Sequence, residues 1–174
     1  MVVLLAVAAA AGAAVALALA GGTETMTVTT TVTRTETVEA ESPLVPAEVE
    51  RTRAAVRAAA EAHDYDALAE LIDPAQFSFS FGDPGGGAVE YWRDLAAQGE
   101  DPLPILARIL ELPYTLFAGA YVWPFAYDKA PNELSDYERG LLGDLVESYA
   151  GESYFGWRAG IRADGKWQFF VRGD

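Results

Sequence analysis

The chain contains no cysteine, and this absence excludes several kinds of chemistry at once. Disulfide bridges, thiolate nucleophiles, cysteine-ligated metal sites and a lipid-modified cysteine all require that residue. If the chain is exported, its folded part must therefore be held together by an apolar core alone.

Histidine is almost absent as well, since His63 is the only one in the chain. A metal site built from several histidines is therefore impossible, and any Ser-His-Asp arrangement would need His63. The acidic residues offer no alternative site, because neither of the two acidic segments has the ligand spacing of an EF-hand. These segments carry Asp83, Glu90 and Asp94 in one case and Asp128, Glu133 and Asp136 in the other. We predict no metal ion and no other cofactor.

Basic residues are scarce relative to acidic ones: 12 Lys and Arg stand against 26 Asp and Glu, which gives a formal net charge of −14. A nucleic-acid partner would favour the opposite sign, because affinity for the phosphate backbone depends on basic side chains. We therefore predict no nucleic-acid partner and interpret the acidity as a source of solubility.

What the chain does have is a long apolar run over residues 1–20, almost entirely Ala, Val and Leu. As a helix, about 20 residues rise about 30 Å, enough to cross the core of a bilayer. No Lys or Arg precedes the run, whereas Ala18-Leu19-Ala20 offers the small residues that a signal peptidase prefers. The run is thus interpreted as an uncleaved membrane anchor or as a cleaved signal peptide. The first predicts a single-pass protein whose domain lies outside the cytoplasm, and the second a secreted protein.

Residues 21–46 are predicted to be a flexible linker. Most residues from 23 to 37 are Thr, several Glu follow, and Pro43 and Pro46 lie near the end. Such a segment has too little apolar surface to offset the entropy lost on ordering. The alternation of Thr and Val would also suit a strand, but no obvious partner for it is present.

Residues 47–174 are predicted to form one α+β domain, with helices packed on a curved, mainly antiparallel sheet. Apolar periodicity and capping residues predict helices over residues 47–62, 65–72, 88–98, 101–112 and 136–150. Alternation and β-rich composition predict strands over residues 77–81, 114–118, 121–127, 155–162 and 166–172. Ser135 and Glu138 have the spacing of a capping box. Pro124 marks its strand as an edge or as the site of a bulge.

The last two strands are predicted to be a hairpin with a three-residue loop, Ala163-Asp164-Gly165. This register pairs Ile161 with Trp167, Ala159 with Phe169 and Trp157 with Val171, so that one face is apolar. Arg158, Arg162, Gln168 and Arg172 then share the other face. A slip of one residue would turn every side chain over, and Gly165 suits the left-handed position of such a loop.

The first part of the domain resembles the NTF2-like superfamily. The resemblance rests on a long first helix, on Ala62-His63-Asp64-Tyr65-Asp66-Ala67-Leu68, on Phe77-Ser78-Phe79-Ser80-Phe81-Gly82, and on Trp167-Gln168-Phe169-Phe170 near the end. It implies a cone of helices against a curved sheet, often with an apolar pocket, in a superfamily of both enzymes and non-catalytic domains. The predicted helix over residues 136–150 departs from the family pattern, in which a continuous meander of strands follows the third helix.

His63 and Asp66 are the candidate catalytic residues if the domain is an enzyme. Imidazole titrates near neutrality and would serve as a general base in the mouth of the cone, beside a carboxylate. The alternative is a histidine that closes the first helix, where the helix dipole favours it.

The aromatic residues offer either a bulky core or the wall of a ligand pocket, because Tyr and Trp carry a polar group on an apolar body. The candidate ligand-binding residues are Tyr91, Trp92, Tyr121, Trp123, Tyr127 and Trp157. We predict first a membrane-tethered domain that binds a small apolar ligand or an envelope protein without catalysis. The alternative is an NTF2-like enzyme that uses acid–base chemistry on a small apolar substrate.

Overall fold

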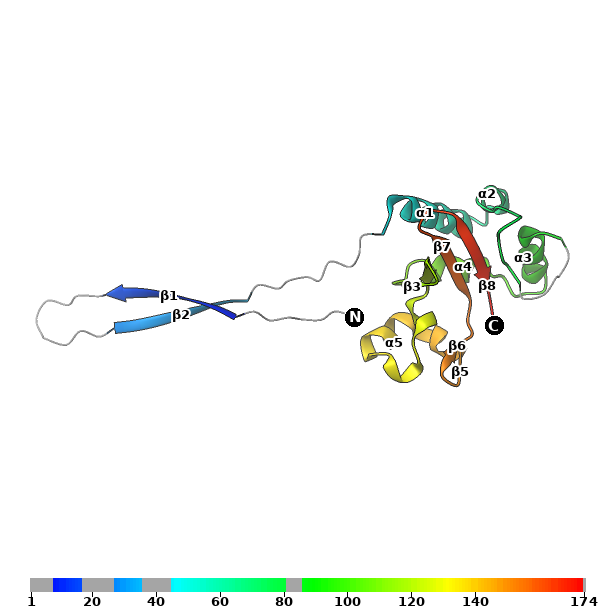
Figure 1. The fold of residues 1–174 in the computed structure, drawn as a ribbon. Coiled ribbons are helices and arrows are strands. Elements are labelled where there is room, and N and C mark those ends of the chain that lie inside the picture. Colours follow the sequence, from blue (N-terminus) through cyan, green and yellow to red (C-terminus); the bar gives the residue numbers. More distant parts are fainter. Residues whose placement is uncertain (1–7, 17–26, 36–44, 81–85, 174) are drawn as a thin grey trace, which may run out of the picture. The chain divides into compact units, whose positions relative to one another are not determined.

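The structure is a computed structural model, and it describes residues 8–16, 27–35, 45–80 and 86–173. These residues belong to two compact units, Met1–Leu44 and Val45–Asp174 (Figure 1).

The first unit contains two strands, β1 (Ala8–Ala16) and β2 (Thr27–Thr35), which pair antiparallel with Ala8 opposite Thr35. The membrane helix predicted over residues 1–20 is therefore not shown, since its middle is β1 and its ends lie outside the described residues. The sequence showed no obvious partner for a Thr-rich strand, and in the structure this strand, β2, pairs with β1 from the apolar run. Among the helices that the structure describes, none is both long and apolar enough to span a membrane.

The second unit is α+β, as predicted. Its α-helices are α1 (Ala47–Glu61), α2 (Tyr65–Glu70), α3 (Ala88–Ala97), α4 (Leu103–Ile109) and α5 (Asp136–Leu142). Short 3-10 helices are η1 (Phe125–Asp128), η2 (Pro131–Glu133) and η3 (Gly143–Ser148). Its strands are β3 (Thr115–Phe117), β4 (Ala120–Trp123), β5 (Tyr149–Ala150), β6 (Ser153–Tyr154), β7 (Arg158–Arg162) and β8 (Trp167–Val171).

The main sheet has four antiparallel strands in the order β3-β4-β7-β8, and its two faces differ in what covers them. Helices α1 and α4 pack on one face, where Trp123, Ile161 and Phe170 are fully buried in the main core. The other face carries Ala120, Val122 and Val171, which are also buried but lie outside that core cluster. The sheet thus has a helix-covered face and, on its reverse, a separate outer face.

The hairpin of β7 and β8 confirms the predicted loop and corrects the predicted register. Gly165 has φ +81° and Ile161 pairs with Trp167, as expected for the three-residue loop. Beyond this pair a bulge shifts the register, so that Phe169 faces Gly160 and Phe170 faces Ala159. The cause is steric: the Phe169 ring lies where a Cβ of residue 160 would be, and only glycine leaves that space.

Two predicted elements of the middle region are shorter than expected. The strand predicted over residues 121–127 ends at Trp123, because Pro124 has no N–H for the ladder, and η1 follows. The helix predicted over residues 136–150 ends at Leu142, because Gly143 turns the backbone with φ +58°. The last predicted residues of that helix form β5 instead, in a small hairpin with β6.

The predicted strand over residues 77–81 is reduced to one described bridge, in which Ser78 pairs in parallel with Phe169 at the edge of β8. Residue 81 lies outside the described residues. The bridge brings the Phe77 ring within 4.8 Å of Trp167 and 6.0 Å of Trp92, measured between centroids. Residues from three distant parts of the chain therefore meet in one aromatic cluster.

The capping box predicted for the start of α5 is present and includes an ion pair. The Ser135 hydroxyl accepts from the Glu138 N–H at 3.2 Å, and the Glu138 carboxylate accepts from the Ser135 N–H at 2.9 Å. Lys129 forms an ion pair with the same carboxylate. The hydrogen bond from Lys129, together with the one from the Ser135 backbone, lowers the pKa of Glu138 to about 2.

Replacing Gly160 by alanine should destabilise the second unit. The added methyl group would overlap the Phe169 ring, and overpacking of this kind costs about 1–3 kcal/mol. Urea unfolding followed by tryptophan fluorescence measures the loss. Gly140→Ala is the matched control, because a methyl group on this exposed helical residue meets nothing within 4 Å. The control should gain about 0.5–1 kcal/mol, and an unchanged stability of Gly160→Ala would contradict the bulge.

Glu138→Gln should lower stability in a pH-dependent manner. A carboxylate whose folded pKa is about 2, against 4.5 normally, stabilises the folded state above pH 4.5 and loses this effect as the pH falls toward 2. The difference in unfolding free energy between wild type and variant should therefore shrink over that window. In a Lys129→Met background most of the difference should disappear, and its persistence there would show that Lys129 is not the main cause.

Candidate functional site

A cavity of about 310 Å³ lies on the outer face of the sheet, opposite the face that α1 and α4 cover. Its walls come from the edge segment beside β8, from the β3–β4 hairpin, from η1 and from the β7–β8 hairpin. The lining residues are Ser78, Ser80, Phe117, Ala118, Ala120, Tyr127, Arg158, Gln168, Phe169 and Val171.

Strand alternation and the bulge together bring these side chains to one face. Arg158 pairs with Val171, and Phe117 pairs with Ala120, so each pair presents both its side chains on the same side. The bulge moves Phe169 to this face, opposite Gly160, while Phe170 enters the core. Without the bulge the cavity would lack the wall that Phe169 forms.

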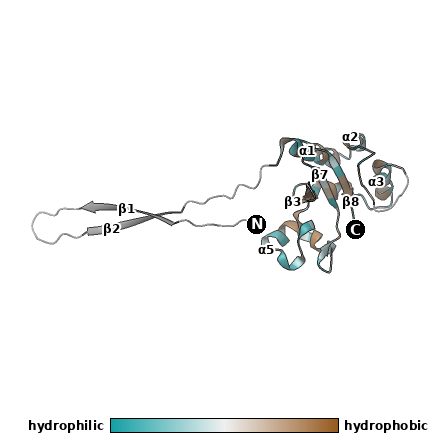
Figure 2. Cartoon of the chain, viewed as in Figure 1, coloured by the Kyte–Doolittle hydropathy of each residue, from teal (hydrophilic) through white to brown (hydrophobic). Residues whose placement is uncertain are grey.

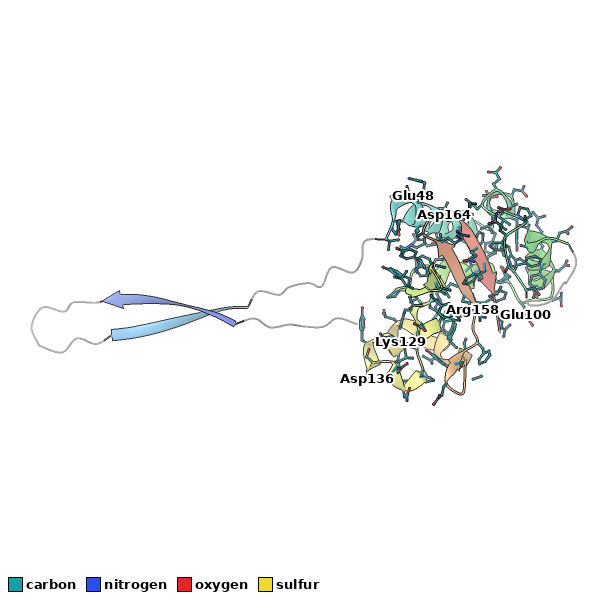
Figure 3. The ribbon with its side chains drawn as sticks, viewed as in Figure 1. Glu48, Glu100, Lys129, Asp136, Arg158 and Asp164 are labelled. Atoms are coloured by element: carbon teal, nitrogen blue, oxygen red, sulfur yellow. The ribbon has the colours of Figure 1, made fainter. Side chains whose placement is uncertain are left out.

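Arg158, which is labelled in Figure 3, is the charged group among the described lining residues of the cavity. Its exposed fraction is 7 %, and no other polar or charged residue among those described in the second unit is classed as buried. Its guanidinium carbon lies 5.1 Å from the centroid of the Tyr127 ring, a cation–π contact. Tyr127 in turn meets Phe117 edge to face at 5.1 Å. An aromatic pair therefore supports a buried cation that stays protonated at every physiological pH.

The cavity combines apolar walls with one positive charge and several neutral polar groups. No Asp or Glu is among its ten described lining residues, although acids outnumber bases about two to one in the whole chain. Hydroxyls of Ser78, Ser80 and Tyr127 and the amide of Gln168 add hydrogen-bonding capacity. Strand β3 borders the cavity and is coloured brown, for hydrophobic, in Figure 2. Its Leu116 and Phe117 are exposed to solvent.

Tyr154 lies near Arg158 and has a raised pKa. Burial raises the pKa of Tyr154 to about 12, while a hydrogen bond with Ser148 and the charge of Arg158 act in the opposite direction. The phenol is therefore neutral at physiological pH and is no candidate for a general base.

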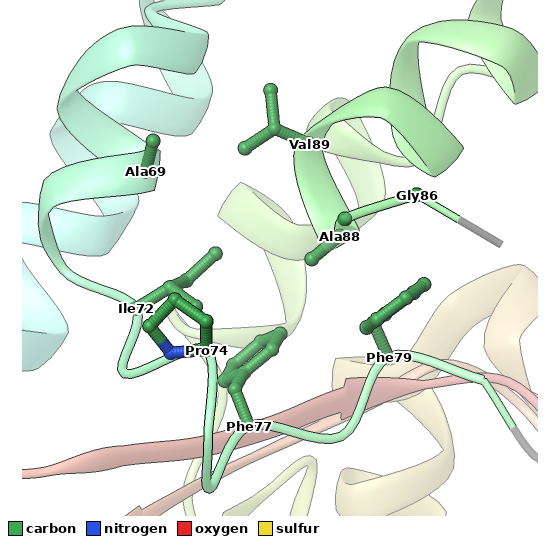
Figure 4. Close-up of a pocket in the computed structure, with 9 residues that line it drawn as sticks. Ala69, Ile72, Pro74, Phe77, Phe79, Gly86, Ala88 and Val89 are labelled. Atoms are coloured by element: carbon green, nitrogen blue, oxygen red, sulfur yellow. The ribbon is translucent and has the colours of Figure 1, made fainter.

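A second cavity, of about 240 Å³, lies between α2, the segment of residues 72–79 and the start of α3 (Figure 4). Its walls are apolar, with Ile72, Phe77, Phe79 and Val89 as the larger side chains. None of its described lining residues carries a charged or hydrogen-bonding side chain. It can accept apolar groups, but it has no side chain that would orient them.

A third cavity, of about 410 Å³, contains Asp101, Trp157, Ser148 and the ion pair of Arg172 with Glu100 at 3.5 Å. Asp101 also contacts His63, whose Nε2 lies 2.8 Å from the carboxylate oxygen. The carboxylate beside His63 is thus Asp101, which sequence reasoning did not propose.

The two predicted catalytic residues have separate partners. His63 closes α1 in a left-handed conformation, φ +52°, and its N–H donates to Ala60. Half of the side chain is exposed, and it lines none of the three cavities. Asp66 is almost fully exposed and contacts Arg93 at 3.3 Å. The structure therefore gives His63 the helix-closing role that was the alternative interpretation, and it adds a carboxylate partner.

The six predicted ligand-binding aromatics separate into different environments. Tyr127 lines the cavity at Arg158, and Trp157 lines the third cavity while stacking on Phe170. Trp92 and Trp123 are fully buried in the core. Tyr91 packs on Phe79, and Tyr121 packs on Tyr114.

Among the ten described lining residues only Tyr127 was predicted, and Arg158 and Phe169 are the two missed residues that shape the cavity most. Arg158 was assigned correctly to the face opposite the apolar set, but not to a site, and Phe169 was assigned to the apolar face. A signal was available in Gly160, because a glycine within a strand indicates a bulge or a close approach of another group.

Comparison with known proteins gives no matching family model, no matching curated protein and no matching solved structure. A function for this chain must therefore be inferred from the geometry of the site.

Proposed function

We propose that the second unit binds a small ligand without catalysing a reaction, in the cavity over Arg158. The observation that carries this proposal is a buried arginine in a cavity whose other described walls combine apolar side chains with neutral polar ones. Apolar walls with a few placed polar groups are the usual composition of a small-molecule site.

The lining chemistry supports binding over catalysis. General acid–base catalysis needs a group whose pKa lies near the working pH. The described lining residues are Ser, Tyr, Gln, Arg and apolar types, and none of these normally titrates near neutrality. Arg158 can hold and orient an anion, but it cannot exchange protons at physiological pH.

An enzyme remains the alternative, and one contact favours it. His63 and Asp101 lie 2.8 Å apart, and Asp101 lines the third cavity. A carboxylate in contact with an imidazole is a common way to orient a general base. The enzyme alternative also rests on the resemblance of residues 62–68 to the NTF2-like superfamily, which includes enzymes.

For the fold we propose a variant of the NTF2-like cone. Support comes from the order α1, α2, the edge bridge at Ser78 and then α3, with the sheet closed by the Trp167 strand. The segment between β4 and β7, which contains α5, η3, β5 and β6, is the departure from that pattern.

We propose further that residues 1–20 tether the domain to a membrane, with the domain outside the cytoplasm. An open two-stranded hairpin would leave unpaired N–H and C=O groups in lipid, each at a cost of several kcal/mol. The run would therefore be helical in a bilayer, in contrast to the strand β1 of the structure.

A ligand of the cavity should stabilise the full chain, and Tyr127→Ala should remove that effect. Native-state binding raises the unfolding free energy by about 2.7 kcal/mol at a hundredfold excess over Kd. Thermal unfolding against a panel of small apolar compounds and cell-envelope fragments measures this shift. Tyr91→Ala is the matched control, since Tyr91 is also a half-buried tyrosine but packs on Phe79 and lines none of the three cavities.

Three results would count against binding at this cavity. One is the absence of any shift across the panel, which would favour an envelope protein as the partner. Another is an equal loss of the shift in both tyrosine variants. The third is chemical conversion of a panel compound, detected by NMR and abolished by His63→Ala, which would support the enzyme.

If residues 1–20 anchor the domain to a membrane, the full chain should float with liposomes in a density gradient. A chain without residues 1–20 should stay in solution. Ala10→Asp should weaken flotation, because a carboxylate at the centre of a membrane helix costs about 2.5–3.5 kcal/mol. Circular dichroism should show added helix in lipid. Recovery from the producing cell of a chain that begins at Gly21 would instead show cleavage and secretion.

A further inference from the structure

We propose that the tip of the β3–β4 hairpin, Leu116-Phe117-Ala118-Gly119, inserts into the interface of a lipid bilayer and so orients the second unit on a membrane. This inference rests on one part of the proposed function, the tether formed by residues 1–20, and does not depend on the small-ligand site. It is carried by the exposed apolar turn, by the tyrosines behind it and by the reach of the chain from the tether.

The tip of the hairpin is apolar where a turn is normally polar. All its residues are exposed, with exposed fractions of 52 % for Leu116 and 46 % for Phe117. Phe117 pairs with Ala120, so the loop consists of Ala118 at φ +49° and Gly119 at φ +81°. A loop with two positive φ angles strongly favours Asn or Asp before Gly, and alanine rarely adopts this conformation. Position 118 is therefore apolar in spite of its backbone conformation.

Apolar groups occupy both faces of the tip, which suits immersion in lipid better than a protein partner on one face. Successive residues of a strand point to opposite faces, so Leu116 and Phe117 lie on different sides of the hairpin. Leu116 pairs with the half-buried Tyr121, and the Phe117 ring meets Tyr127 at 5.1 Å. Tyrosine is enriched at membrane–water interfaces, because its ring is apolar and its hydroxyl is polar. Each exposed apolar side chain thus has a tyrosine beside it on its own face.

Charged residues begin just behind the tip and limit the depth of insertion. The sequence has no charged residue between Glu111 and Asp128. On the neighbouring strand, Arg162 lies opposite Ala120, is exposed and contacts Asp164 at 3.7 Å. An arginine can lay its carbon stem along apolar surface while its charged end stays among the polar headgroups. Insertion is therefore limited to the tip, at the level of the interface rather than the bilayer core.

The tip is too small to hold the protein on a membrane alone, so its insertion depends on the tether. Stable attachment normally takes two signals, because a single apolar group binds weakly and reversibly. Residues 21–44 connect the apolar run to the second unit, and a chain spans at most about 3.3–3.6 Å per residue. A covalent link of such length keeps the tip at an effective concentration of about millimolar near the bilayer. In the full chain a weak second contact is then sufficient.

The test uses one fluorescent label per protein, which the absence of cysteine makes possible. Ala118→Cys and the matched control Ala97→Cys are labelled with a nitrobenzoxadiazole dye in the full chain. Ala97 is an exposed residue at the end of α3. Trp92 of the same helix packs on Trp167 of β8, at the opposite edge of the sheet from β3.

Vesicles of phosphatidylcholine serve as the membrane, since a neutral lipid does not repel a chain of net charge −14. When the vesicles are added, the emission of the label at position 118 should shift to shorter wavelength and lose most of its quenching by iodide. A nitroxide on the upper acyl chain of the lipid should quench this label. The label at position 97 should change in none of these respects.

Leu116→Ser in the labelled Ala118→Cys chain should restore most of the iodide quenching, because it removes an apolar side chain from the inserted tip. Leu116 is half exposed, so the change should leave the fold intact. Tyr137→Ser removes an exposed aromatic side chain on α5 and should leave the protection at position 118 unchanged.

Flotation of the same samples separates the possible failures. If the chain floats with the vesicles but the label at position 118 stays open to iodide, the tip faces water, and the inference fails while the tether stands. Protection at position 118 without vesicles would show that protein covers the tip, for example a second copy of the chain. Equal protection at positions 118 and 97 would show adsorption without a fixed orientation. Both results overturn the inference. If the chain does not float, the tether and the inference fail together.

Discussion

The close approach of the Phe169 ring to Gly160 is the constraint on which the second unit depends. The ring occupies the place of a missing Cβ, and this fixes the bulge in β8. The bulge lets two consecutive phenylalanines serve different faces: Phe170 completes the core, and Phe169 forms a wall of the outer cavity. Core and candidate site are therefore set by the same local departure from regular strand pairing.

The chain has no cysteine for disulfides, and contacts between aromatic rings from distant parts of the chain stabilise its core. Trp92 contacts Trp167 at 5.8 Å and Phe170 at 5.6 Å, and Trp157 stacks on Phe170 at 4.6 Å. Such pairs contribute about 0.5–1.5 kcal/mol each beyond the burial of their area. The indole N–H groups of Trp92 and Trp123 are buried without a hydrogen-bond partner, at a cost of about 1–3 kcal/mol each. The core uses these side chains for their bulk and accepts that cost.

How far the sequence could predict this structure depends on whether a feature is local. Caps, periodicity and turn residues are local, so α1, α3, the box at Ser135 and the loop ending in Gly165 were predicted correctly. The bulge depends on which ring faces Gly160 across the hairpin, which no single strand encodes, so Phe169 was placed on the wrong face and the burial of Arg158 was not predicted. Likewise, the partner of His63 is Asp101, a residue far along the chain that only the packing of the helices brings near. For the candidate site, the sequence therefore predicted one residue, Tyr127, and did not predict the buried charge of Arg158.

The position of the β5–β6 hairpin has a consequence for how the domain can vary. Strands β4 and β7 are neighbours in the sheet, yet the chain between them leaves to form α5, η3 and this small hairpin before it returns. The entropy of closing such an excursion rises only with the logarithm of its length, by about 0.6 kcal/mol for each doubling. The exposed turn at Gly151 and Glu152 already connects paired residues, Tyr149 and Tyr154. Added residues there would lengthen the excursion at small entropic cost while the register of the main sheet stays fixed, so this turn is the natural place for the domain to grow.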